Sequence, residues 1–258
     1  MSDASRISPG RIWTAALLVI GDEILSGRTH DKNIAQVATW LNAQGIRLKE
    51  VRVVADDMAA IVEAVNALRA RHDYLFTTGG IGPTHDDITV DAVAAALGVE
   101  VVIHPDARAM LEAYYAPRGG VNEARLRMAR VPAGASLIEN ALSGAPGIAV
   151  GNIHLLAGVP HIAAEMLAAL TGKLDGGLPV LSDTIGCWVT ESEVADLLRE
   201  TEQAHAGCQI GSYPFFREGR VGANFVIRAT DQRVIDACAA DLMAGLAALG
   251  REGVPGGI

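Results

Sequence analysis

Apolar residues in the first two thirds of the chain form two alternating patterns. Residues 13–20, 74–78 and 153–157 are continuous runs rich in apolar and β-branched residues, which is typical of strands that are covered on both faces. Between these runs, apolar residues recur at i, i+3, i+4 and i+7, the spacing of one helix face. Short links between the strands and helices predict a three-layer α/β fold, with a mostly parallel sheet and helices on both faces. The helical pattern is carried by Ile34, Val37, Ala38 and Leu41, by Met58, Ile61, Val62, Val65 and Leu68, and by Val90, Val93, Ala94 and Leu97.

Aspartates stand immediately before two of the predicted helices. Asp56 and Asp57 precede the second helix, and Asp86 and Asp87 are expected to open the third. An aspartate at this position often caps a helix by accepting a hydrogen bond from a free backbone N–H group. Capping is therefore one interpretation of these residues, and any functional role has to be weighed against it.

The last third of the chain follows a different pattern, after a glycine-rich segment. Residues 171–179 are expected to form a linker because glycines gather there. We therefore predict two domains, residues 1–175 with the parallel sheet and residues 176–258 with a small α+β module. Within the module we expect strands near residues 182–189, 209–213 and 221–229, a helix around Val194, a helix over residues 231–249 and a loose tail at residues 250–258.

The composition sets limits on the function. The chain has 258 residues, half of them hydrophobic, which is enough for one α/β core and a smaller module. Its formal net charge of −9 argues against nucleic acid or an anionic membrane as the main partner. An anionic small molecule would therefore need a local site of hydrogen-bond donors or a metal ion.

The cysteines and the apolar runs indicate a cytoplasmic protein. Cys187, Cys208 and Cys238 are far apart in the sequence and lack the spacing of a zinc site or a disulfide framework, so we expect reduced core residues. The first ten residues have no signal-peptide pattern. Because the apolar runs are too short or too often interrupted by polar residues to span a bilayer, we expect no membrane contact.

The most informative segment joins the strand at residues 74–78 to the helix that follows it. Its turn contains Gly79, Gly80 and Gly82, which allow positive φ and let backbone N–H groups point to one place without a Cβ in the way. Exposed N–H groups attract anions, whereas Asp86 and Asp87 would repel an anion unless a metal ion lay between them. The turn therefore predicts a phosphate site that also uses Mg²⁺.

Two common phosphate-binding loops are excluded by the letters of the sequence. A P-loop needs Gly-Lys-Ser or Gly-Lys-Thr, and neither occurs in the chain. A dinucleotide fingerprint that starts at Gly80 would need a third glycine where His85 stands. His85 itself is a minor candidate for a proton donor, because a lone histidine in a loop is more often a surface residue.

Other polar loops are expected to meet the glycine turn. In open parallel sheets, ligands bind beyond the carboxyl ends of the strands. The loops that begin at Gly21, Asp56, Gly79 and Gly158 all follow predicted strands or start helices at that edge. The sequence therefore predicts one ligand site to which several loops contribute.

Taken together, the motifs resemble the molybdopterin-binding domain family, whose fold is shared by MogA, MoaB and the N-terminal part of CinA. The resemblance runs from about residue 15 to residue 170 and continues into the small module, and the CinA-like branch fits better than MogA. It is carried by Gly21-Asp-Glu-Ile-Leu-Ser-Gly27, by Thr77-Thr-Gly-Gly-Ile-Gly-Pro-Thr-His-Asp-Asp-Ile-Thr89, by Val131-Pro-Ala-Gly-Ala with Asn140, and by Gly144-Ala-Pro-Gly147.

The chain also departs from the pattern of that family. It ends where the amidohydrolase domain of CinA would begin, so the resemblance does not assign deamidation of nicotinamide mononucleotide to these residues. Leu156-Ala-Gly-Val-Pro160 stands where the family usually has Leu-Pro-Gly, which changes one of the ligand loops. The resemblance further implies self-association into a homo-oligomer.

The resemblance assigns roles to particular residues. Asp87 matches the aspartate of Asp-x-Thr that the family uses in catalysis or metal binding, so we expect Asp87 to be catalytic and, with Asp86, to bind the metal. Asp56 matches a second acidic position and is the second catalytic candidate. The expected ligand- and phosphate-binding residues are Gly21, Asp22, Glu23, Ser26, Gly27, Thr78, Gly79, Gly80, Gly82, Pro83, Thr84, Gly158 and Pro160.

Three functions remain open at this point. The leading expectation is a protein that binds a phosphorylated pterin or an adenine nucleotide with Mg²⁺ and hydrolyses a diphosphate such as ADP-ribose. The second is transfer of an adenylyl group to molybdopterin in molybdenum cofactor biosynthesis. The third is a binding module for a nucleotide or pterin without turnover, which the altered Leu-Ala-Gly loop would suit.

Overall fold

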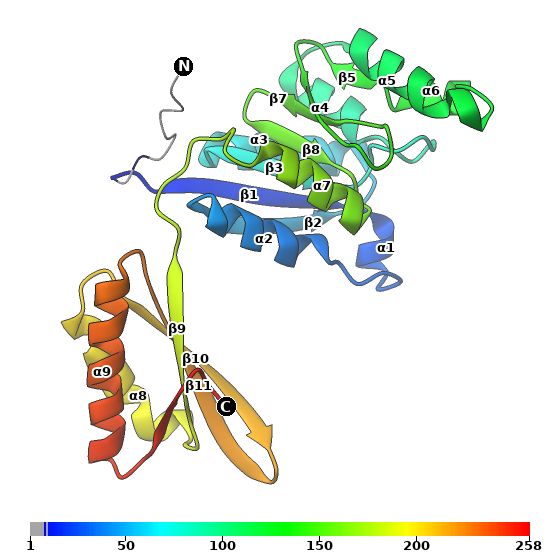
Figure 1. The fold of residues 1–258 in the computed structure, drawn as a ribbon. Helices are drawn as coiled ribbons and strands as arrows, with labels where there is room; N and C mark the ends of the chain where they lie inside the picture. The colour runs from blue at the N-terminus through cyan, green and yellow to red at the C-terminus, as the bar shows by residue number, and fades with distance from the viewer. Residues whose placement is uncertain (1–7, 9) are drawn as a thin grey trace. The chain divides into compact units, whose positions relative to one another are not determined.

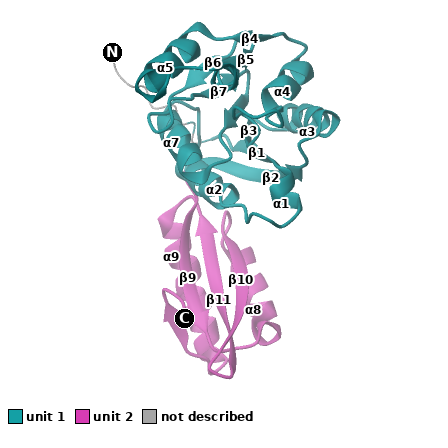
Figure 2. Cartoon of the chain, turned by 90° about the vertical axis from the view of Figure 1, so that its right-hand side faces the viewer, with its two compact units in different colours: residues 1–178 teal, residues 179–258 magenta. Residues whose placement is uncertain are grey.

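The computed structural model describes residue 8 and residues 10–258. It contains two compact units, residues 1–178 and residues 179–258, and each has its own hydrophobic core (Figure 2). The expectation that the first ten residues form no signal peptide falls mainly on residues outside the described part. None of the described helices is long and apolar enough to cross a membrane.

Unit 1 is built on a six-stranded sheet (Figure 1). Four neighbouring strands pair in parallel, and two further strands continue the sheet in antiparallel pairing. The predicted fold class, a mostly parallel sheet between helices, is therefore confirmed. From one edge to the other, the strands are β2 (Ile46–Val54), β1 (Trp13–Ile20), β3 (Tyr74–Thr78), β8 (Ile153–Leu156), β7 (Gly147–Val150) and β6 (Ser136–Ile138).

Helices cover both faces of this sheet, and this explains the apolar runs in the sequence. Along β1, Leu18 packs into the core on one face and Leu17 into the core on the other, and both side chains are fully buried. A strand with two buried faces is apolar at every position, whereas a strand with one buried face alternates. The helices are α3 (Met58–Arg71) and α4 (Thr89–Leu97) on the first face and α2 (Asn33–Ala43) and α7 (Pro160–Leu170) on the second.

The start of α4 differs from the prediction. Its first residue is Thr89 and its N-cap is Ile88, which provides no side-chain cap. The expectation that Asp86 and Asp87 open this helix is therefore wrong. The Asp87 carboxylate instead accepts hydrogen bonds from Thr84, so that the turn closes on itself before the helix begins.

Between α4 and β6 the chain leaves the sheet and forms an excursion, residues 98–135. Ala107, Leu111 and Ala129 form a small core within this excursion. The excursion contains β4 (Val101–Ile103) paired with β5 (Arg130–Pro132), α5 (Pro105–Tyr115), the 3₁₀ helix η1 (Ala116–Arg118) and α6 (Glu123–Arg127).

A one-turn helix, α1 (Asp22–Leu25), lies where the sequence predicts a loop after β1.

Two of the three glycines of the expected linker, Gly176 and Gly177, are packed against other backbone segments. The N–H group of Gly177 donates to the carbonyl oxygen of Gly45 at 3.1 Å. A Cβ atom on Gly176 would lie 2.0 Å from the carbonyl oxygen of Gln44, so no larger residue fits without a shift of the backbone. Glycine here serves close contact between two backbone segments, and a composition-based linker prediction does not distinguish this from flexibility.

Unit 2 is a four-stranded antiparallel sheet with two helices on one side (Figure 1). Ile185, Phe225 and Ile227 point from the sheet into a core that includes Ile235 and Leu242 of the last helix. In sheet order the strands are β10 (Gln209–Arg217), β11 (Arg220–Ala229), β9 (Leu181–Cys187) and β12 (Gly253–Pro255), and the helices are α8 (Glu191–Ala204) and α9 (Gln232–Ala248).

Two details of unit 2 differ from the sequence-based expectation. The tail is ordered, because β12 pairs with β9 and the side chain of Asn224 bonds both the N–H and the carbonyl group of Ile258. The cysteines are buried thiols as expected, yet Cys208 and Cys238 lie with their Sγ atoms 3.3 Å apart. Neither contact follows from the local sequence, because each joins segments 30 or more residues apart.

Candidate functional site

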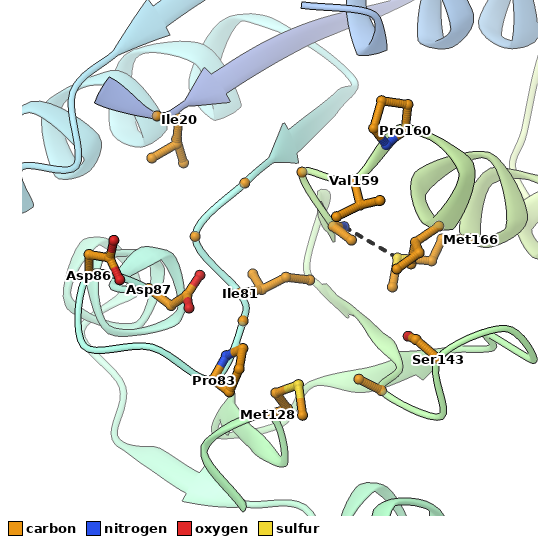
Figure 3. Close-up of a pocket in the computed structure, with 18 of the residues that line it drawn as sticks. Ile20, Ile81, Pro83, Asp86, Asp87, Met128, Ser143, Val159, Pro160 and Met166 are labelled. Atoms are coloured by element: carbon orange, nitrogen blue, oxygen red, sulfur yellow. Dashed lines mark hydrogen bonds between the residues drawn. The ribbon is translucent and has the colours of Figure 1, made fainter. Parts of the chain in front are cut away.

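A cavity of about 620 Å³ opens at the carboxyl ends of β1, β3 and β8 (Figure 3). It lies where the topology of a parallel sheet places ligands. Of the residues expected at a site, the ones that line it are Gly21, Glu23, Asp56, Gly79, Gly80, Gly82, Pro83, Asp86, Asp87, Gly158 and Pro160.

The glycine turn has a conformation that other residues would not tolerate. Gly79 and Gly80 have φ values of 101° and 67°, as the sequence predicts, whereas Gly82 does not have a positive φ. A Cβ atom on Gly79 would lie 2.1 Å from the carbonyl oxygen of Ile20, and one on Gly80 would lie 2.1 Å from Oγ1 of Thr89. The buried Thr89 hydroxyl donates to the Gly79 carbonyl oxygen at 2.9 Å, which fixes the turn to the start of α4.

Backbone donors of this turn are free to meet a ligand. Within the described part of the chain, the N–H groups of Gly80, Ile81 and Gly82 make no hydrogen bond. A Cβ atom on Gly82 would lie 2.7 Å from Oδ2 of Asp87, so the carboxylate and the free amides are neighbours. The turn thus presents donors for phosphate oxygens next to a group that can hold a cation.

Asp87 is held in a defined position. Its Oδ2 atom accepts from the backbone N–H of Thr84 at 2.7 Å and also from the Thr84 hydroxyl. Its Oδ1 atom has no partner among the described residues. Figure 3 shows Asp86 and Asp87 on one side of the glycine turn, while Val159 and Met166 lie on the other.

Asp56 does not cap α3, the helix that follows it in the sequence. The N-cap of α3 is Asp57, whose Oδ1 atom accepts from the N–H of Ala60 at 2.9 Å. Asp56 instead lines the cavity and accepts from the N–H of Asp22 at 3.0 Å. The capping interpretation is therefore correct for Asp57 and wrong for its neighbour.

The carboxylates at the cavity influence one another. Burial raises the pKa of Asp56, and the charges of Asp22, Glu23 and Asp86 raise it further. The Thr84 hydroxyl, by contrast, holds the pKa of the exposed Asp86 below its usual range. Several carboxylates that repel each other around one cavity favour a bound cation.

The residues present suit Mg²⁺ if a ligand supplies part of its coordination. No group of three or more His, Cys, Asp or Glu side chains within the described residues converges closely enough to hold a metal ion on its own. Mg²⁺ is commonly held by one or two carboxylates together with substrate phosphates and water. Asp86 and Asp87 beside the free amides of the turn match this second arrangement.

Five expected residues do not line the cavity. Thr84 is engaged with Asp87, and Ser26 donates from its hydroxyl to the carbonyl oxygen of Glu23 at 3.3 Å. Asp22 starts α1, and Gly27 ends the turn after it with a φ of 71°. Thr78 is buried in β3 and borders a second, smaller cavity of about 60 Å³.

The altered Leu-Ala-Gly loop is fixed from the neighbouring helix α2. The amide of Asn33 donates to the Gly158 carbonyl oxygen at 2.8 Å, and the amide of Gln36 donates to that of Pro160 at 3.0 Å. A Cβ atom on Gly158 would lie 3.2 Å from the Cα atom of Gly79. The two ligand loops are therefore packed against each other.

The far wall of the cavity is mainly apolar, and none of its residues was among the expected site residues. The sequence motif at residues 144–147 includes part of this wall, but no sequence pattern indicates the wall residues that come from the excursion. Tyr115 is one of these, and the guanidinium of Arg125 lies 4.2 Å from the centre of its ring. The wall consists of Ile81, Tyr115, Met128, Ser143, Ala145, Pro146, Val159, Ile162 and Met166.

The cavity thus has two chemically different halves. The apolar wall suits a planar ring system, while the glycine turn and carboxylates suit phosphates with a divalent cation. His85 is exposed and does not line the cavity.

Comparisons with known proteins cover both units. Residues 16–176 match a family described as a probable molybdopterin binding domain, and residues 179–250 match the middle domain of FAD synthase. A protein from Aeropyrum pernix is 33% identical over 214 residues, which is 79% of each chain. A CinA-like protein from Desulfosudis oleivorans is 39% identical over 158 residues, 59% of this chain and only 38% of that relative.

One solved structure is similar in fold and in sequence. It is described as the protein CinA, with unknown function, from Thermoplasma acidophilum. The two chains are 33% identical with a TM-score of 0.58, and the match covers 63% of this chain and 98% of that one.

Proposed function

Because the chain belongs to the family of probable molybdopterin-binding domains, and within it to CinA-like proteins, we propose that the cavity binds a phosphorylated pterin or an adenine nucleotide together with Mg²⁺. The observation that supports this most directly is the division of the cavity. A ring would pack between Tyr115 and Met166, and its phosphates would reach the free amides of the glycine turn.

We further propose that the ligand is a diphosphate such as ADP-ribose and that the site hydrolyses it. Water attacks one phosphorus atom, the bridging P–O bond breaks, and AMP and ribose 5-phosphate leave. Asp56 suits the proton acceptor because its pKa is raised, which makes it a stronger base than an ordinary aspartate. Asp86 and Asp87 would hold the cation, which would neutralise charge on the phosphates when bound.

The test is release of AMP from ADP-ribose by the purified chain with Mg²⁺. We expect turnover that Asp87→Asn lowers at least a hundredfold, because the carboxylate charge beside the phosphates is lost. Asp106→Asn is the matched control, since Asp106 is an exposed aspartate in the first turn of α5 and not at the cavity. Equal rates for the wild type and Asp87→Asn would contradict the proposal.

A second candidate is a binding module without turnover. The hydrogen bonds from Thr84 to Oδ2 of Asp87 favour it, because they engage the carboxylate in holding the turn. In that case ADP-ribose with Mg²⁺ raises the melting temperature and no AMP appears. Parallel incubation with ATP and molybdopterin tests adenylyl transfer, since the family description names molybdopterin as the bound molecule.

A further inference from the structure

One surface of unit 2 gathers aromatic rings and arginines. The sheet has α8 and α9 on one side (Figure 1). The strand residues that alternate with the core residues therefore face away from these helices. We call this side the arginine–aromatic face and define it by Trp188, Tyr213, Phe215, Arg217, Arg220 and Arg228. It lies in unit 2 and shares no residue with the cavity of unit 1.

Two of the rings rest on glycines of the same sheet. A Cβ atom on Gly222 would lie 2.5 Å from Cζ of Phe215, and one on Gly211 would lie 3.0 Å from Cε2 of Tyr213. Glycine therefore makes room for each ring to lie against the backbone. Tyr213 remains 47% exposed, so part of its ring is available to solvent. The rings form an exposed aromatic cluster in which Trp188 and Phe215 meet edge to face, with centroids 5.3 Å apart and ring planes at 75°.

Each guanidinium group lies against one of the rings, and that of Arg228 also donates a hydrogen bond to the Tyr213 hydroxyl. That of Arg220 lies 4.3 Å from the centre of the Trp188 ring, and that of Arg228 lies 5.6 Å from the Tyr213 ring. Arg217 is placed 5.2 Å from the ring of Phe215. Cation–π contact holds each planar guanidinium over a ring, so that its outer surface can receive another planar group.

The charge of these arginines is not neutralised locally. Within the described part of the chain none of the three forms an ion pair, whereas Arg199, Arg233 and Arg251 all do. Residues 179–258 contain eleven acidic residues and six arginines, yet β9, β10 and β11 carry no acidic side chain at the positions of this face. The whole-chain charge of −9 therefore hides a local positive surface.

We propose that the arginine–aromatic face binds single-stranded nucleic acid. Unpaired bases stack on aromatic rings and on guanidinium planes, and arginine side chains pair with the phosphates between them. Tyr213 and Phe215 are two residues apart on one strand, about 7 Å along it, so successive bases of an extended strand can reach successive rings. A duplex does not offer its bases in this way, because they are paired inside the helix.

The arrangement favours a strand over smaller or other anions. A mononucleotide meets only one ring and one or two arginines on a flat surface, so a polymer that repeats these contacts binds more tightly. An acidic peptide would pair with the arginines but brings no bases to stack on the rings. The expectation drawn from net charge, that nucleic acid is not a partner, does not take this segregation of charge into account.

The test uses the full chain and a fluorescein-labelled single-stranded RNA of twelve mixed nucleotides, followed by fluorescence anisotropy at low salt. We expect saturable binding that weakens as salt rises, with a slope of about −2 in log K against log salt for three phosphate contacts. Tyr213→Ala combined with Phe215→Ala is expected to weaken binding at least tenfold, because two stacking surfaces are lost. Arg220→Ala and Arg228→Ala together should lower the salt slope as well.

Matched variants on the other side of the same unit serve as controls. Phe216→Ala removes an exposed ring from the neighbouring position of β10, and Arg233→Ala removes an arginine that pairs with Asp231 on α9. Both should bind RNA like the wild type, and circular dichroism checks that every variant is folded. The proposal is overturned if no binding occurs at 100 µM protein, if the controls weaken binding as much as the face variants, or if polyglutamate competes as well as unlabelled RNA.

Discussion

At the scale of single residues, adjacent aspartates have different roles. Asp57 caps α3 through the Ala60 N–H, while Asp56 faces the cavity and has a raised pKa. The sequence presents the pair as two equal candidates for a cap. The two residues differ in the direction of their side chains. This direction depends on the strand before them and the helix after them, so the local sequence does not reveal it.

This separation predicts opposite effects of two alanine substitutions. Asp57→Ala should lower the free energy of unfolding by about 1 kcal/mol, the usual cost of losing an N-cap, and leave ADP-ribose binding unchanged. Asp56→Ala should change the free energy of unfolding by less than about 0.5 kcal/mol and reduce turnover. Urea denaturation and AMP release measure the two effects. Loss of stability in both variants would show that Asp56 also supports the helix.

Two glycines with the same backbone angle allow a second prediction. Gly80 and Gly98 both have a φ of 67°, but a Cβ atom meets Thr89 at Gly80 and meets nothing within 4 Å at Gly98. Gly98→Ala should cost about 1 kcal/mol from the left-handed conformation alone. Gly80→Ala should cost about 3 kcal/mol, because steric overlap with the buried Thr89 adds to that strain. Equal costs in urea denaturation would mean that the turn shifts freely.

His154 makes stability depend on pH. Burial lowers its pKa to about 4, and its ring stacks on Phe76 with centroids 4.9 Å apart. In the unfolded chain the pKa is about 6.5, so the unfolded state binds the proton more readily. Stability is fully present above pH 6.5 and is lost as the pH falls toward 4, by about 3 kcal/mol for this group.

His154→Phe should remove this part of the acid sensitivity and keep the stacked ring. The free energy of unfolding of the wild type and the variant, measured from pH 7 to pH 4, should therefore diverge by about 3 kcal/mol. The carboxylates titrate in both proteins and cancel in the difference. Parallel curves would show that His154 is protonated in the folded state without cost.

At the scale of elements, the sequence pattern predicted those strands, helices and turns whose structure depends on neighbouring residues. β1, β3, β8 and the helices between them were predicted because a strand with two covered faces is apolar throughout and a covered helix has one apolar face. The glycine turn was predicted for a similar reason, since its backbone angles exclude other residues at Gly79 and Gly80. In each case the constraint acts on neighbouring residues.

Other elements depend on contacts that are distant in the sequence. The order of the tail depends on Asn224, 34 residues before Ile258. The apolar wall depends on where the excursion returns to the sheet. Such contacts leave no periodic signal, so the acidic half of the candidate site was predictable and most of the apolar half was not.

At the scale of the whole molecule, the two units have separate cores. Leu242 is fully buried among residues of unit 2 alone. Leu242→Ala should therefore destabilise unit 2 by about 2–5 kcal/mol and leave ADP-ribose binding unchanged. Scanning calorimetry with and without ligand should show one transition that shifts with the variant and another that shifts with the ligand. A single transition that responds to both would show that the units unfold together.

The origin of the apolar wall has a consequence for how such proteins diversify. Tyr115 and Met128 belong to the excursion, which has its own small core, whereas the glycine turn is packed directly on β1 and α4. Substitutions at Tyr115 and Met128 should therefore alter the apolar wall at little cost to the sheet, whereas the turn tolerates almost none. On the proposed function, relatives are expected to share the phosphate end of their ligands and to differ in the ring.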